Sequence, residues 1–169
     1  IKLADVHKSS LTLTPHTENA ERLVRTTRDF VESQKEPIRS GRHLAKIMGG
    51  KAQRIRDNVI ALIEGTSPDR EDLFRMMRVI KEHLVTNLTD RDFADMYAQT
   101  LVYGLFAARY ADTTPDDFSR QEARDLVPAT NPFLRHFFDH ISGATFPKRL
   151  DLIVQELCTV FTHADVKTL

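Results

Sequence analysis

Two histidines spaced as i and i+4 come closest, in type and spacing, to a metal site in this sequence. His136 and His140 share one face of a predicted helix, as in zincin-type sites, and Asp139 stands where the reversed form of that motif carries Glu. A catalytic zinc also needs a third protein ligand, for which only His163 or Glu156 is available. Nothing in the sequence spacing predicts that His163 or Glu156 lies close to His136 and His140. Partly exposed helical histidines are therefore the favoured interpretation, and a metal-dependent hydrolase is the weaker one.

Other catalytic chemistry is missing from the sequence. There is no Gly-x-Gly-rich turn for a nucleotide or S-adenosylmethionine, and no phosphate loop of the Gly-x-x-x-x-Gly-Lys type. The carboxylate-x-lysine pattern of Asp165 and Lys167 lies in a helical context, whereas a nuclease needs such groups at strand ends around a metal. Cys158 has no neighbour that would activate its thiol. We therefore predict no catalytic, cofactor-binding or metal-ligating residue in this chain.

The tripeptide Asn131-Pro132-Phe133 invites comparison with the Asn-Pro-Pro-Tyr/Phe motif that holds the target adenine in amino-methyltransferases. The second proline is missing here, and the methyltransferase motif lies at the end of a strand. Asparagine before proline is also the ordinary start of a helix, because Asn caps the free N–H groups and Pro fits the first turn. We interpret the tripeptide as a helix cap.

Residues 37–56 are rich in cations and contain no acidic residue; the nearest acidic residue before them is Glu36. In a chain of zero net charge, such a cationic stretch could hold a DNA phosphate backbone without reading its sequence. The alternative is an ordinary solvated helix face. The candidate phosphate contacts are Arg39, Arg42, Lys46, Lys51, Arg54 and Arg56.

Two other groups of side chains bear on nucleic-acid binding. The arginines of the first predicted helix could extend the cationic surface but are diluted by acidic neighbours; they are Arg22, Arg25 and Arg28. Four aromatic residues of a long central helix could stack on bases, although core packing is the favoured interpretation; they are Tyr97, Tyr103, Phe106 and Tyr110.

Composition places the chain among globular proteins. Its 169 residues suffice for one core, and the hydrophobic fraction of 41% with 28% charged residues argues against disorder. The single cysteine indicates a reducing cytoplasm, and no apolar run reaches the roughly 20 residues that cross a bilayer. No signal peptide is evident. With no initiator Met and no helix-stop signal at the end, we expect a fragment or an excised domain.

Apolar residues recur at helical spacing along most of the chain and predict an all-α, helical-bundle-like domain of about seven helices. Residues 1–16 form an N-terminal extension, with a short strand or frayed end over 1–6 and a polar loop over 7–15; residues 17–169 form the helical domain. Gly49-Gly50 interrupts the cleanest helical period and predicts a kink, a close helix approach or a break.

From about Leu11 to Leu169 the sequence resembles the helical connector that precedes the methyltransferase domain in fused type IIG-like restriction–modification enzymes and related bacterial adenine-specific (N6) DNA methyltransferases. The resemblance is carried by these segments: Thr26–Ser40, His43–Ala52, Phe93–Arg109, Phe118–Ala123, Asn131–Arg135 and His163–Val166. It implies a domain between a nuclease-like domain, of which residues 1–16 would be a remnant, and a methyltransferase domain that uses S-adenosylmethionine. No family catalytic residue transfers here, since neither the Phe-x-Gly-x-Gly nor the Asn-Pro-Pro-Tyr/Phe motif occurs.

The function that this resemblance implies is structural. The chain would be the helical spacer that couples and orients the two catalytic domains on double-stranded DNA, with non-specific phosphate contacts. The alternative is a stand-alone helical protein-interaction module with no DNA role.

Overall fold

The computed structural model describes residues 4–7, 12–15, 17–32, 38, 40–83, 85–114, 117–128 and 130–169 of the chain. The chain divides into two compact units, residues 1–36 and 37–169. The first unit contains β1 (Ala4–His7), β2 (Thr12–Pro15) and α1 (Thr17–Glu32). The second contains α2 (Gly41–Glu64), α3 (Arg70–His83), α4 (Asp90–Ala111), α5 (Arg120–Leu126), α6 (Pro132–Ser142) and α7 (Lys148–Thr162). The described residues thus hold seven helices, and the prediction of an all-α fold with about seven helices is confirmed.

The first unit adds a small β-hairpin that the sequence indicated only in part. Strands β1 and β2 pair antiparallel, with Ala4 opposite Pro15 and His7 opposite Thr12. The prediction of a polar loop over residues 7–15 was therefore wrong for Thr12–Pro15. Thr12, Leu13 and Thr14 suit an extended backbone, but four residues are too few to show a period of two.

The boundary between the units also differs from the one expected from the sequence. The extension was drawn over residues 1–16, whereas the first unit continues to Glu36 and includes α1. The helical period of α1 was read correctly. It says that a helix forms, but it does not say which residues that helix packs with.

Side-chain caps fix where the helices of the second unit begin. The Ser40 hydroxyl accepts from the backbone N–H of His43 at 3.2 Å and starts α2. Thr89 and Asp92 form a reciprocal capping box at the start of α4. At the start of α5, a capping box of this kind is only half present. Ser119 accepts from the Glu122 N–H, but the Glu122 carboxylate accepts from the Thr114 hydroxyl instead.

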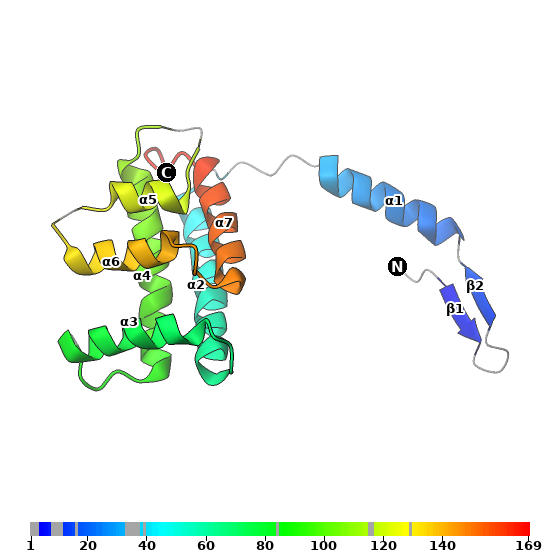
Figure 1. The fold of residues 1–169 in the computed structure, drawn as a ribbon. Coiled ribbons are helices and arrows are strands. Elements are labelled where there is room, and N and C mark those ends of the chain that lie inside the picture. The colour runs from blue at the N-terminus through cyan, green and yellow to red at the C-terminus, as the bar shows by residue number, and fades with distance from the viewer. Residues whose placement is uncertain are drawn as a thin grey trace. The chain divides into compact units, whose positions relative to one another are not determined.

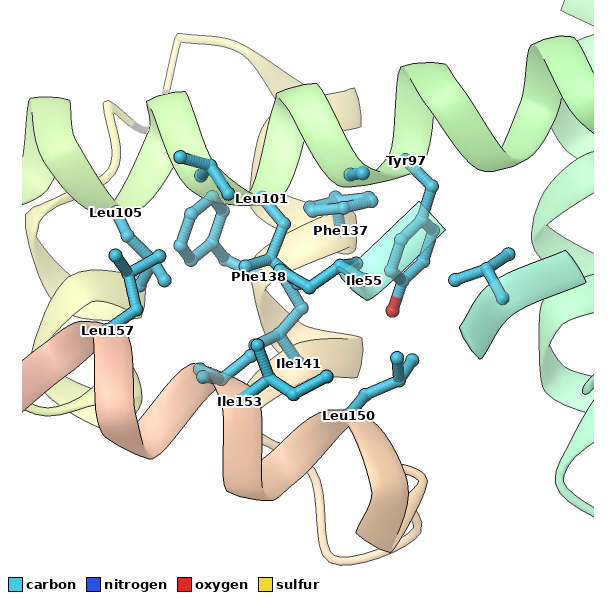
Figure 2. Close-up of a cluster of buried hydrophobic side chains, with 14 of the residues drawn as sticks. Ile55, Tyr97, Leu101, Leu105, Phe137, Phe138, Ile141, Leu150, Ile153 and Leu157 are labelled. Carbon is cyan, nitrogen blue, oxygen red and sulfur yellow. The ribbon is translucent and has the colours of Figure 1, made fainter. Parts of the chain in front are cut away.

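Helices α2 and α4 form the main packing pair of the second unit and run antiparallel, with α7 beside α2 (Figure 1). Side chains from α2, α4, α6 and α7 meet in one apolar cluster, which includes Ile55, Leu101, Phe138, Ile141 and Leu157 (Figure 2). Each of these five side chains is fully buried. Burial of these apolar side chains is the main contribution to the free energy that stabilises the fold.

Two glycine positions turn out to serve different purposes. A Cβ at Gly104 would lie 2.6 Å from the Phe138 ring, so this glycine allows α6 to pack closely on α4. Gly49 and Gly50 have nothing within 4 Å of such a Cβ, and α2 runs through them without a break. The close approach predicted there is not present among the described residues.

A buried ionic cluster ties the end of α4 to the C-terminal segment. Arg109 pairs with Asp112 and also donates to the carbonyl of Phe161 at 3.0 Å. Burial alone would raise the pKa of the Asp112 carboxyl, but hydrogen bonds from Thr114 and Arg109 hold it below its usual range. Lys167 donates to the Asp112 carbonyl at 2.8 Å. The cluster ties residues 109–114 to Phe161 and Lys167.

Candidate nucleic-acid interface

Most of the cationic stretch (residues 37–56) lies on the first two thirds of α2. Arg42 and Lys46 are both exposed and stand on successive turns of this helix. Neither forms an ion pair with any described residue. Arg39 lies outside the described residues, so its place relative to the other two is not assigned. The two exposed cations are the part of the predicted phosphate-binding set that the fold leaves open to a ligand.

Lys51 and Arg54 point to a different neighbour. Both pair with the Glu156 carboxylate of α7, Arg54 at 3.0 Å. The Lys51 side chain is only 18% exposed, so this contact is part of the packing between α2 and α7. Hydrogen bonds from Lys51 and Arg54 lower the pKa of Glu156, and Lys51 makes the larger contribution. Half of the charge on these two cations is therefore offset within the fold.

Arg56 is paired as well, since its guanidinium donates to the adjacent Asp57 carboxylate at 3.0 and 3.1 Å. The sequence could show this neighbour, but it could not show Glu156, which lies more than 100 residues away in the chain. The five described members of the set thus divide into two exposed cations, Arg42 and Lys46, and three that are already bound to carboxylates.

A small hollow lies at the seam between α2 and α4. Its volume is about 130 Å³, and its lining consists of Ala45, Met48, Gly49, Ala52, Gln99, Val102 and Tyr103. Tyr103 is 62% exposed at its edge, and Tyr110 further along α4 is 57% exposed. The interpretation of the four α4 aromatics as core is therefore right for Tyr97, which is fully buried, and wrong for these two tyrosines.

The two histidines of the zincin-like spacing do not share one environment. His136 is exposed, whereas His140 packs edge-on against Tyr97 and Phe146 with ring centroids 6.3 and 5.8 Å away. Burial lowers the pKa of His140, and nearby Asp72 opposes this effect. Within the described part of the chain, no three His, Cys, Asp or Glu side chains gather as a metal site. The third ligand of the hydrolase hypothesis is thus not found there.

Cys158 lines a hollow of about 420 Å³ between the start of α5 and α7, together with Arg120 and His163. The thiol is buried, and burial raises its pKa to about 12. The guanidinium of Arg120 is held by the carbonyl of Ile141 at 2.9 Å and by Asp151 at 3.3 Å. A thiol in this environment stays protonated at neutral pH, so the arrangement does not supply a nucleophile.

Asn131 has the role that its sequence context indicated. Its side-chain oxygen accepts from the backbone N–H of Leu134 at 3.0 Å, and Pro132 occupies the first turn of α6. The asparagine is a helix cap, and this interpretation is confirmed.

Comparisons with known proteins add no constraint. No protein-family model, no curated protein and no solved structure matches the chain. In the portion that the structure describes, no helix has both the length and the apolar character needed to cross a bilayer.

Proposed function

We propose that this chain is the helical spacer of a restriction–modification enzyme or adenine-specific DNA methyltransferase, and that it contacts the DNA phosphate backbone through Arg42 and Lys46. One observation carries the contact: these two cations are exposed and without an ion pair among the described residues, whereas the other described cations of the stretch are bound to carboxylates.

The spacing of the pair suits a phosphodiester backbone. Side chains four residues apart on a helix stand about 6 Å from each other, so both can reach phosphates of one strand. No acidic residue lies between them or on the adjacent turns of α2. Tyr103 stands across the neighbouring hollow with its ring exposed, where it can pack on the sugar–phosphate surface. A contact of this kind positions the protein without reading bases.

The spacer role rests on the sequence resemblance and on the stiffness of the α2–α4 pair. At about 1.5 Å per residue, the 24 residues of α2 span about 36 Å, close to one turn of duplex DNA. Two long helices packed along their length hold their ends at a fixed separation. In this proposal the adjacent nuclease-like and methyltransferase domains, the latter using S-adenosylmethionine, are kept at a set distance on double-stranded DNA.

Titration of the full chain against a labelled DNA duplex at several salt concentrations tests the contact. Each phosphate contact contributes about 0.9 to the slope of log affinity against log salt. The double variant R42Q/K46Q should therefore reduce that slope by about 1.8 and weaken binding equally for unrelated DNA sequences.

A matched control removes the same charge elsewhere. Arg78 on α3 and Arg91 on α4 are exposed, and neither forms an ion pair with a described residue, so R78Q/R91Q should leave the slope unchanged. Equal losses in the two double variants would show that only net charge matters. No affinity for duplex DNA, or affinity that does not depend on salt, would contradict the proposed contact.

The second candidate is a helical protein-interaction module, favoured by the exposed Tyr103, which lines an apolar hollow, and by the exposed Tyr110 further along α4. The coding sequence around the chain separates the two. A reading frame that continues beyond Leu169 into a methyltransferase supports the spacer, whereas a stop codon directly after Leu169 supports the module.

A further inference from the structure

Helix α1 has a pattern of exposed side chains that is complementary to itself. Every residue from Ala20 to Arg28 is exposed, including Leu23 at 38% and Val24 at 57%. A helix of 16 residues with β-branched Val24, Thr26 and Thr27 is marginal in water unless its apolar face is covered. The question is which surface covers it.

Three small, uncharged side chains of α1 follow a heptad spacing. Ala20, Val24 and Thr27 are separated by four and three residues, as the a and d positions of a coiled coil are. Leu23 lies on one flank of this row. Glu21 and Arg28 lie on the other flank, seven residues apart and therefore on the same line of the helix. Neither Glu21 nor Arg28 has an ion pair within the described part of the chain.

We propose that α1 pairs antiparallel with α1 of a second copy of this chain. In an antiparallel pair, the flank that carries Glu21 and Arg28 faces the same flank of the other copy. A twofold axis between Arg25 and Thr26 then brings Glu21 of each copy close to Arg28 of the other, and the two opposite-charge contacts form together. The Val24 layer meets Thr27 of the second copy.

The charges also select the direction of pairing. In a parallel pair, the charged flank of one helix faces the opposite flank of the other. Arg28 would then lie against Leu23 of the second copy, and Glu21 would gain no cation. Opposite charges that flank an apolar seam set partner choice and orientation in coiled coils. The seam is short and its side chains are small, so the association is weak, concentration-dependent and reduced by salt.

Sedimentation equilibrium of the full chain over a wide concentration range tests the pairing. The wild type should show reversible dimerisation. E21R places Arg against Arg28 of the other copy and should weaken the association at least tenfold. R28E should do the same. The double variant E21R/R28E exchanges the charges and should restore the wild-type dissociation constant, which a merely damaged helix would not do.

Engineered cysteines report the direction independently. Mixed V24C and T27C chains should form a disulfide between copies, while A20C alone should not, because antiparallel pairing separates the two copies of residue 20. Native Cys158 is buried and contributes little background. A chain that stays monomeric at every concentration, a dimer that E21R leaves unchanged, or efficient linkage through A20C would each overturn the proposal. DNA plays no part in these measurements, so their outcome is independent of the proposed spacer function.

Discussion

Replacement of Gly104 by alanine tests the packing of α6 on α4. The new Cβ would meet the Phe138 ring at 2.6 Å, well inside van der Waals contact. Phe138 is fully buried, so its ring has little room to move away. Overpacking of this kind costs about 1–3 kcal/mol, whereas alanine gains about 1 kcal/mol over glycine in a helix. We expect G104A to lower the free energy of unfolding by up to about 2 kcal/mol.

The same substitution elsewhere in the fold provides a matched control. Gly49 and Gly50 lie inside α2 with nothing within 4 Å of an added Cβ. G49A and G50A should therefore each raise the free energy of unfolding by about 1 kcal/mol through helix propensity alone. The change in the free energy of unfolding should therefore be negative for G104A in α4 and positive for G49A and G50A in α2, although the chemical change is identical.

Urea unfolding of the full chain, followed by far-ultraviolet circular dichroism, measures all three variants. A double-mutant cycle assigns the cause: in an F138L background, the penalty of G104A should shrink, because the shorter side chain leaves space for the methyl group. If G104A instead stabilises the chain as much as G49A does, the ring of Phe138 does not close on α4, and our account of this contact is refuted.

Three further predictions follow from buried polar groups. The Tyr97 hydroxyl is buried without a hydrogen-bond partner among the described residues, so Y97F should raise the free energy of unfolding by about 1 kcal/mol or more in urea melts. D112N leaves Arg109 buried without its carboxylate and should cost about 3 kcal/mol at neutral pH. Because the folded-state pKa of Asp112 lies below its usual value of 3.8, the pair stabilises the fold above that pH and is lost as the pH falls through the lowered pKa; the difference between wild type and D112N should narrow in acid. Burial raises the pKa of Cys158 to about 12, so iodoacetamide should alkylate it only when urea unfolds the chain, and rapid alkylation of the native protein would contradict its burial.

The helices could be predicted from the sequence because their signals are local. In α2 the apolar period of Leu44, Met48, Ile55 and Val59 specifies both the helix and its buried face, and all four side chains are in the core. Ser40 and Asn131 mark helix starts through bonds to residues three positions away. Such patterns need no knowledge of the rest of the fold.

Glycine shows where local signals end. The Gly49-Gly50 pair and Gly104 are each a glycine within an apolar helical period, and helix propensity treats them alike. Only the position of Phe138 on another helix distinguishes the glycine that is required by packing from those that are not. The unit boundary after Glu36 has the same origin, since it depends on which elements contact each other rather than on where a helix begins.

The candidate site shows most clearly that local sequence signals do not reveal contacts between distant segments of the chain. Six cations within twenty residues predict a phosphate-binding surface when only the absence of nearby acids in the sequence is considered. Glu156, a distant residue in the chain, lies against Lys51 and Arg54 once α7 packs beside α2. A cation already bonded to a carboxylate gives up that contact when it binds a phosphate, and its net gain is small. In the proposed contact, the cations that bind a phosphate at the least internal cost are the ones without an ion pair among the described residues. Arg42 and Lys46, and not the whole cationic stretch, are therefore the positions to test.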